Sequence, residues 1–302
     1  MQNVIDPAVG GWTQPASGAQ RALRAPRLWH RLLPFALCLV ALLAYAGQQG
    51  VLRQLEREGI ETKAMGRETP QDFGVPFESL SLPVNGRVLQ ARVVRSASPS
   101  DRAILIFHGN GEAISDWSLA QARLQAAGVS SMVFDYSGFG DSTGQATVDH
   151  LREDAYRAYQ AFLAALPQAS ARYVMGHSLG NAVMLDAVAG LQPSPAGIIV
   201  HAGFTSARDM AVQEGLVPPW MSRLLPDPWD NEARMAQKGP AILVLHSDRD
   251  EVISPAMGAR LAKAAGHRAS FVLLSGPRHD SVYQDFPSLI WQPILAFMQP
   301  SL

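Results

Sequence analysis

One serine has the sequence surroundings of a nucleophile. It lies in Gly176-His177-Ser178-Leu179-Gly180, between an apolar stretch and a segment of helical composition. A G-x-S-x-G sequence between a strand and a helix is typical of a tight turn that strains the serine and exposes its Oγ. The flanking glycines suit this turn because a side chain at either position would collide with nearby backbone. We therefore predict that Ser178 is a nucleophile; the alternative is an ordinary turn serine.

A serine hydroxyl needs a base within hydrogen-bond reach, and the base needs an acid to orient it. Three carboxylates follow the predicted strand 241–246, namely Asp248, Asp250 and Glu251. We favour Asp250 because the loop must carry the acid beyond the strand end to an imidazole. Asp248 suits a turn, and Glu251 suits the start of the next helix.

His279 is the predicted base, which gives the order Ser, Asp, His along the chain. It follows the last predicted strand, 270–274, on a Gly-Pro loop, and is therefore expected near the carboxyl edge of the sheet. Other histidines adjoin the ends of predicted strands or helices, where packing and surface roles predominate. These are His150, His177, His201, His246 and His267.

Acyl transfer, the chemistry that this order allows, also needs hydrogen-bond donors for the oxyanion of the tetrahedral intermediate. We expect the backbone N–H of Leu179, directly after the nucleophile, to be one donor. The second is expected from Asn110, in the loop His108-Gly109-Asn110-Gly111-Glu112 after the predicted strand 103–107. The same loop could be a flexible turn, which is compatible because glycines let a backbone approach a ligand closely.

Composition narrows the function further. The chain has 302 residues and a formal net charge of -1, and its basic residues are scattered through the domain, so nucleic-acid binding is not expected. Its single cysteine, Cys38, excludes an intramolecular disulfide and a cysteine-based metal cluster. Histidines and carboxylates are not grouped at metal-ligand spacing, and no glycine-rich phosphate motif follows the first parallel strand. We expect no cofactor and no metal.

Short apolar runs alternate with longer helical patterns, which predicts an α/β protein. We expect a mostly parallel sheet with helices on both faces. Asn85-Gly86 predicts an antiparallel hairpin at one edge of this sheet. The predicted strands are 77–82, 87–94, 103–107, 131–135, 172–175, 197–201, 241–246 and 270–274, and the predicted helices are 117–127, 148–166, 179–189 and 255–265.

Residues 204–239 interrupt this alternation with four prolines and with tryptophan and methionine residues, which predicts a small, irregular cap. The apolar side chains of the cap could line an acyl pocket or could simply pack onto the edge of the sheet. The sequence leaves both possibilities open.

The N-terminal region contains an apolar run, residues 32–46, preceded by four arginines. Fifteen residues span roughly 22 Å as a helix, less than the hydrocarbon core of about 30 Å, but an extension to residue 52 reaches that width. We predict a disordered basic tail (1–31), a signal anchor or signal-peptide-like segment (32–52), a linker (53–75) and a catalytic domain (76–302). The charge bias predicts an exported, periplasmic or extracellular domain. A signal cleaved after Ala44-Tyr45-Ala46, or a buried helix, is the alternative.

Five motifs in order, HGNGE, FDYSGFGDSTG, GHSLG, HSDRDEVI and GPRHD, make the chain similar to the α/β-hydrolase superfamily over roughly residues 70–300. It most resembles a membrane-anchored branch with an HGN oxyanion loop, whose members include lysophospholipid hydrolases and protein depalmitoylases. The resemblance implies Ser178, Asp250 and His279 as a triad and Asn110 and Leu179 as oxyanion donors. The chain departs from the branch in its short hydrophobic segment and at Gly111-Glu112.

Together these features predict a serine hydrolase of acyl esters or thioesters that works through a covalent acyl-enzyme. The expected partners are a small-molecule or lipid-like acyl substrate and a membrane, the latter through the N-terminal segment. A peptidase or acyltransferase of the same fold, or a non-catalytic binding module, is the alternative.

Overall fold

The computed structural model describes residues 45–54, 56–57, 59–63, 66–98, 101–284 and 288–299. The chain divides into two compact units after Ala46, and the description below concerns the second unit. The predicted tail 1–31, and the predicted hydrophobic segment 32–52 up to residue 44, lie outside the described residues. No helix in the described part of the chain is long and apolar enough to cross a membrane.

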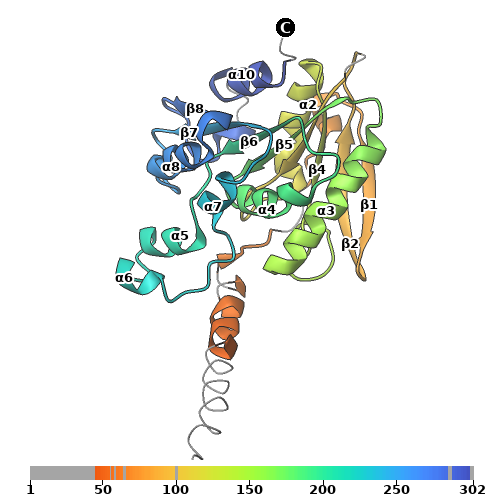
Figure 1. Ribbon diagram of the computed structural model, residues 1–302. Coiled ribbons are helices and arrows are strands. Elements are labelled where there is room, and N and C mark those ends of the chain that lie inside the picture. Colours follow the sequence, from red (N-terminus) through yellow and green to blue (C-terminus); the bar gives the residue numbers. More distant parts are fainter. Residues whose placement is uncertain are drawn as a thin grey trace, which may run out of the picture. The chain divides into compact units, whose positions relative to one another are not determined.

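Within the described residues, eight strands form one sheet in the order β1-β2-β4-β3-β5-β6-β7-β8 (Figure 1). β2 pairs antiparallel with both β1 and β4, and the other neighbours pair in parallel. The predicted parallel sheet with an antiparallel edge hairpin is thus confirmed. The strands are β1 (Glu78–Val84), β2 (Arg87–Val94), β3 (Arg102–Phe107), β4 (Ser130–Phe134), β5 (Ala171–His177), β6 (Gly197–His201), β7 (Ala241–Ser247) and β8 (Ala269–Leu274).

The central strands are apolar throughout because both faces of the sheet are covered. In β3, Leu105 and Phe107 belong to one hydrophobic core, whereas Ile104 and Ile106 belong to a second core on the opposite face. This division follows the two-residue period of a strand. A continuous apolar run therefore supplies two cores from one strand.

Helices cover both faces of the sheet, as predicted (Figure 1). The first core contains side chains from α3 (Val148–Ala165), α4 (Leu179–Ala187), α7 (Asn231–Met235) and α8 (Pro255–Ala265). The second core contains side chains from α2 (Ser118–Ala126), α9 (Ser281–Gln284) and α10 (Ser288–Phe297). Short 3-10 helices complete the fold: η1 (Pro70–Phe73), η2 (Ile114–Trp117), η3 (Val188–Gly190) and η4 (Gly266–Arg268).

Two helix boundaries differ from the prediction, because the chain tightens into a 3-10 turn at each. The helix predicted at 117–127 is preceded by η2 and begins as an α-helix at Ser118. The helix predicted at 179–189 ends as an α-helix at Ala187 and continues as η3. Such turns are common at helix ends, where they satisfy backbone groups that lack an α-helical partner.

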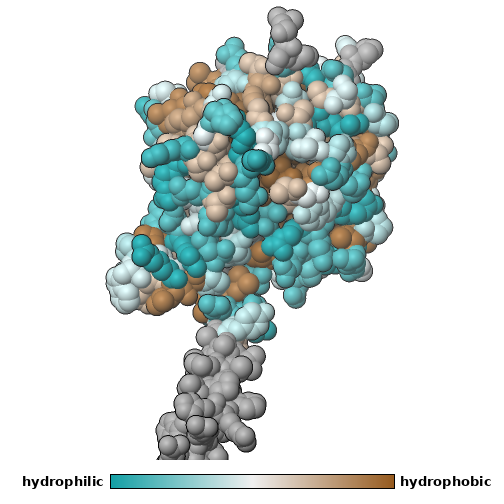
Figure 2. Space-filling model, viewed as in Figure 1, coloured by the Kyte–Doolittle hydropathy of each residue, from teal (hydrophilic) through white to brown (hydrophobic). Residues whose placement is uncertain are grey.

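The cap predicted at residues 204–239 contains α5 (Ala207–Gln213), α6 (Pro219–Ser222) and α7. Side-chain N-caps begin two of these helices, since Ser206 accepts from the Asp209 N–H and Asp230 accepts from the Ala233 N–H. Some apolar residues of the cap are buried in the first core, whereas others around α6 are exposed. Figure 2 shows apolar surface on the cap, at the lower left of the view.

Phe162 on α3 offers a test of the first core, in which its side chain is fully buried. Phe162→Ala should lower the free energy of unfolding by about 3–5 kcal/mol, because it removes buried apolar surface and leaves a cavity. Gln160→Ala, at an exposed position of the same helix, should stay within about 0.5 kcal/mol of the parent. Urea unfolding followed by circular dichroism measures both. Equal losses in the two variants would contradict this assignment of the core.

Candidate active site

The predicted site residues converge because β3, β5, β6, β7 and β8 are parallel, so that their carboxyl ends meet at one edge of the sheet. The oxyanion loop (residues 108–112) follows β3, and Ser178 follows β5. The loop with Asp250 follows β7, and His279 follows β8. Ligand sites of open α/β sheets lie at this edge.

Ser178 occupies a strained turn between β5 and α4. Its φ of 50° and ψ of -119° lie in a region that residues with a side chain rarely adopt. Its N–H donates to the His201 carbonyl at 3.2 Å, which ties the turn to β6. A Cβ on Gly180 would lie 2.0 Å from the Phe107 carbonyl oxygen, and one on Gly176 would lie 2.6 Å from the Asn181 Cα. The turn therefore needs a glycine at both positions.

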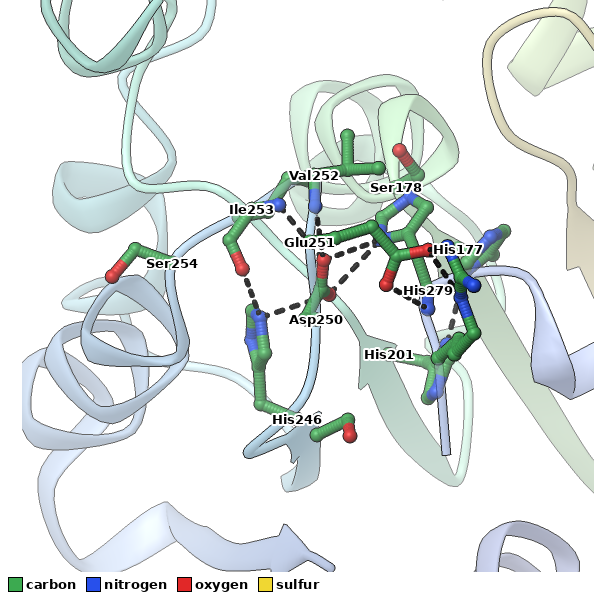
Figure 3. A network of polar contacts seen from close by, with 12 residues as sticks. His177, Ser178, His201, His246, Asp250, Glu251, Val252, Ile253, Ser254 and His279 are labelled. Atoms are coloured by element: carbon green, nitrogen blue, oxygen red, sulfur yellow. Dashed lines mark hydrogen bonds and ion pairs between the residues drawn. The ribbon is translucent and has the colours of Figure 1, made fainter. Parts of the chain in front are cut away.

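Asp250 and His279 are in direct contact (Figure 3). The His279 Nδ1 lies 2.9 Å from each carboxylate oxygen of Asp250. The backbone N–H groups of Val252 and Ile253 donate to Asp250 Oδ1 at 2.9 and 2.8 Å. His246 Nε2 lies 3.2 Å from the other carboxylate oxygen. The acid is thus held by its own loop as well as by the imidazole.

The two rival carboxylates have other partners. Asp248 accepts from the Gly276 N–H and the Ser275 hydroxyl, both at 3.0 Å, which agrees with a role in the turn. Glu251 accepts from the Arg278 Nε at 2.8 Å. Its predicted role at the start of a helix is wrong, because α8 begins only at Pro255 and Glu251 instead joins its loop to the one that carries His279.

The contact between Asp250 and His279 perturbs both side chains. Burial alone would raise the pKa of Asp250, but hydrogen bonds from His246, His279 and the backbone hold this pKa well below its usual value. Burial alone would lower the pKa of His279, but the hydrogen bond and charge of Asp250 outweigh it and raise the pKa. Asp250 therefore stays ionised beside an imidazole of increased basicity.

Ser178 and His279 lie beside one another in Figure 3. The imidazole of His279 packs on His177, the residue before Ser178, with ring centroids 4.9 Å apart. Among the residues drawn in Figure 3, Ser178 Oγ makes no hydrogen bond. Catalytic hydrogen bonds are often long without a ligand and tighten when the substrate binds. The geometry agrees with the predicted triad, whose catalytic role stays a prediction.

The two predicted oxyanion donors, Asn110 and Leu179, both line the cavity that contains Ser178. Leu179 is the first residue of α4, so its N–H lies at the helix N-terminus. The side chain of Asn110 is held from outside the loop. Its Oδ1 accepts from the Glu61 N–H at 2.8 Å, and its Nδ2 donates to the Gly59 carbonyl at 3.1 Å.

A buried network behind the site escaped the sequence analysis. Glu112 accepts from the Gly109 N–H at 2.8 Å and from the Trp117 Nε1 at 2.9 Å, and it lies 3.2 Å from His177 Nε2. His177 Nδ1 in turn lies 2.9 Å from His201 Nδ1. His177 and His201 are buried, as the packing role predicted for them requires, but they also connect the oxyanion loop to the nucleophile turn. The departure at Glu112 was the one sequence signal of this network.

Charge within this network is set by burial and by neighbouring groups. Burial alone would raise the pKa of Glu112, but His177 outweighs it and the pKa is lowered. Burial, with the nearby His177 and His279, lowers the pKa of His201 well below its usual value. Glu112 is therefore ionised and His201 neutral near pH 7.

A cavity of about 270 Å³ opens beside Ser178. Its walls are mostly apolar, and they come from the cap, from the site itself and from residues 52–60. The cap contributes Phe204, Met210, Leu216, Leu225 and Trp229, among others. The two roles left open for the cap are therefore combined, since Phe204 and Trp229 pack in the core and also line the cavity.

His177, His279 and Asp280 could place three ligand atoms within 4.8 Å of one another. His279 Nδ1 is already bonded to Asp250, and both ring nitrogens of His177 face partners in the buried network. We therefore assign no metal to this group. The expectation that the chain needs no cofactor stays a prediction.

A family model described as "Serine aminopeptidase, S33" matches residues 98–237. The matched range contains the oxyanion loop and Ser178, and it ends before Asp250 and His279. It covers slightly less than half of the chain.

Curated relatives share the sequence at modest identity. Protein bem46 of Schizosaccharomyces pombe is 28% identical over 199 residues, covering 62% of this chain and 65% of that protein. Lysophosphatidylserine lipase ABHD12 of Danio rerio is 28% identical over 219 residues, covering 63% of this chain and 56% of that protein. The chain thus matches less than two thirds of the length of either relative.

Solved structures share the fold. An esterase of Pyrococcus furiosus, Pf2001, superposes with a TM-score of 0.65 at 16% identity, covering 79% of this chain and 96% of the esterase. A soluble variant of the monoglyceride lipase of Saccharomyces cerevisiae, with a substrate analog, gives a TM-score of 0.61 at 13% identity, covering 74% and 95%. At these identities the likeness shows the α/β-hydrolase fold alone.

The raised pKa of His279 predicts the pH dependence of any activity that uses it as a base. Only the neutral imidazole accepts a proton, so kcat/KM should rise with pH through a pKa above the usual value of about 6.5. Asp250→Asn should lower kcat by about 10³- to 10⁴-fold. It should also move this acidic limb to lower pH, because the carboxylate that raises the pKa is gone. Ester hydrolysis from pH 5 to 9 measures both effects.

Asp248→Asn is the matched control, because Asp248 lies on the same loop but binds Gly276 and Ser275. Its acidic limb should coincide with that of the parent. An unmoved limb in Asp250→Asn would contradict the assignment of His279 as the titrating base.

Proposed function

Because the chain belongs to the α/β-hydrolase superfamily, we propose that it is a serine hydrolase of acyl esters or thioesters, with Ser178, His279 and Asp250 as its triad. One observation carries the proposal. The Asp250 carboxylate holds the His279 imidazole at the same sheet edge as the strained Ser178 turn. A strained serine, a basic imidazole and an ionised acid are the groups that this chemistry requires.

Acylation begins when His279 Nε2 accepts the Ser178 hydroxyl proton while Oγ attacks the acyl carbonyl carbon. The carbonyl oxygen becomes an oxyanion, which accepts hydrogen bonds from the backbone N–H groups of Asn110 and Leu179. The tetrahedral intermediate then expels the alcohol or thiol, which takes the proton from His279. The product of this step is an acyl ester of Ser178.

Deacylation repeats the sequence with water as the nucleophile. His279 accepts a proton from water while the hydroxyl attacks the acyl-enzyme, and it returns that proton to Ser178 Oγ as the carboxylic acid leaves. Asp250 remains ionised throughout and stabilises the imidazolium, in agreement with its lowered pKa.

The apolar lining of the cavity supports a substrate with an acyl chain. The names of two similar proteins point the same way, since one is a lysophosphatidylserine lipase and the other a monoglyceride lipase. A thioester would fit the same site, because the acyl group and the oxyanion are the same for both leaving groups.

A peptidase is the second candidate, and the description of the matching family model, serine aminopeptidase, favours it. The same triad can cleave an amide if the cavity accepts an N-terminal residue. Hydrolysis of aminoacyl p-nitroanilides at rates above those for esters would select this candidate. Product analysis with a competing alcohol would reveal an acyltransferase, and failure to label Ser178 would indicate a binding module.

Ser178→Ala tests the proposed function directly. With a panel of p-nitrophenyl esters and acyl thioesters, the full chain should turn over at least one class, and Ser178→Ala should lose at least about 10⁴-fold in kcat. A fluorophosphonate probe should label the parent and Ser79→Ala, a matched change at an exposed serine of β1, but not Ser178→Ala. A parent that hydrolyses no member of the panel and resists the probe would sink the proposal.

We further propose that residues 32–52 hold the chain at a membrane with the catalytic domain on the exported side. The arginines before the apolar run support this orientation. The exposed apolar side chains of the cap support contact with lipid, since Leu216, Trp220 and Leu224 are 70%, 73% and 71% exposed.

Protease accessibility in spheroplasts tests this orientation. Protease added to intact spheroplasts that express the full chain should digest the catalytic domain, because that domain faces outward, while a cytoplasmic marker survives. A domain that is digested only after lysis would contradict the exported orientation.

A further inference from the structure

The residues that precede the first strand meet the site at two places. We define the pre-strand segment as residues 52–54, 56–57 and 59–63, which were predicted as the end of the hydrophobic stretch and the start of a linker. We propose that this segment is a working part of the active site, which fixes the oxyanion donor Asn110 and forms one wall of the acyl cavity. The inference rests on the proposed function.

Three hydrogen bonds join the segment to the oxyanion loop. The Glu61 N–H donates to Asn110 Oδ1 at 2.8 Å, and Asn110 Nδ2 donates to the Gly59 carbonyl at 3.1 Å. The Gly111 N–H donates to the Glu61 carbonyl at 2.9 Å. Both ends of the Asn110 amide are therefore held, and so is the peptide group that follows it. Two residues of the segment thus set the orientation of Asn110.

The loop needs this outer support because glycines flank Asn110 on both sides. Gly109 and Gly111 have no side chains with which to anchor the loop. On the inner side, Glu112 holds the Gly109 N–H at 2.8 Å. On the outer side, the contacts to Asn110 and Gly111 come from the segment. An oxyanion donor acts only when it is fixed in advance, so losing the outer contacts should reduce the rate of the chemical step.

The segment is itself attached to the domain on both sides of these contacts. The Val148 N–H donates to Glu56 Oε1 at 2.9 Å, and the Gly140 N–H donates to the Lys63 carbonyl at 2.8 Å. The Lys63 ammonium lies 2.9 Å from Asp116. Ile60, 8% exposed, packs in the first core. The segment can therefore position the loop rather than only follow it.

The segment also forms a wall of the cavity. Leu52, Glu56, Gly59 and Ile60 line the same space as Ser178, together with residues of the cap. Leu52 is half-buried there, whereas its neighbour Arg53 is exposed and lies outside the lining. An acyl chain bound in this cavity would contact the segment, so the side chain at position 52 should limit the length of that chain.

Leu52→Trp tests the wall in the full chain, with Arg53→Trp as the matched control. The added bulk should lower the ratio of kcat/KM for p-nitrophenyl dodecanoate to that for the butanoate by at least about tenfold. Arg53→Trp adds the same indole outside the cavity and should leave the ratio at the parent value. Equal ratios in the two variants would overturn the assignment of the wall.

Glu61→Pro tests the positioning of Asn110, because proline lacks the N–H that Asn110 Oδ1 accepts. Its kcat on the butanoate should fall about 10- to 100-fold relative to Glu61→Ala, which keeps the N–H, while KM changes less than about threefold. Asn110→Ala removes the same contacts without altering the segment backbone, and it should show the same loss in kcat. Thermal unfolding checks that each variant is folded.

Folded Glu61→Pro and Asn110→Ala variants with the kcat of the parent would overturn the positioning role. A merely structural role would lower the melting temperature and leave kcat unchanged. An active parent with unaffected variants would sink this inference alone. A parent inactive on all esters and thioesters would sink the proposed function and the inference with it.

Discussion

The approach of α4 to the end of β3 at Gly180 is too close for any residue with a Cβ, because that atom would lie 2.0 Å from the Phe107 carbonyl oxygen. The rest of the site depends on this contact. It places the first N–H of α4 against the oxyanion loop, and it forces the chain from β5 to reverse within one residue, so that Ser178 takes a positive φ. The strain at Ser178 is thus a result of close packing between the helix and the sheet.

Buried acid–histidine pairs hold the loops at the carboxyl edge of the sheet. Asp250 contacts His279 and His246, Glu112 contacts His177, and Asp135 lies 3.4 Å from His108. Removing one partner of a buried pair is costly, typically about 3–5 kcal/mol, because the remaining charge is left unpaired. Each pair joins groups from different segments of the chain, so the loops are fixed to one another as well as to their own strands.

The sequence predicted what depends on local pattern. Asn85-Gly86 identified the hairpin, and the apolar runs identified the strands. The choice of Asp250 over its neighbours agrees with its contact to His279. The pre-strand segment went unrecognised because most of its contacts to the oxyanion loop use backbone atoms, which every residue has. His246 was assigned a minor role because only the fold brings its ring to Asp250. The membrane segment stays a prediction, since most of it lies outside the described residues.

The topology of the sheet has a consequence for biosynthesis. Asp250 and His279 are 29 residues apart, and Glu61 and Asn110 are 49 residues apart, so the site is built from contacts of long range in sequence. Parallel pairing of this kind forms slowly, because chain entropy is lost before the contacts form. On the ribosome, the nucleophile turn and the oxyanion loop emerge well before β8. A nascent chain therefore carries its strained serine without its base until the last strand of the sheet has paired.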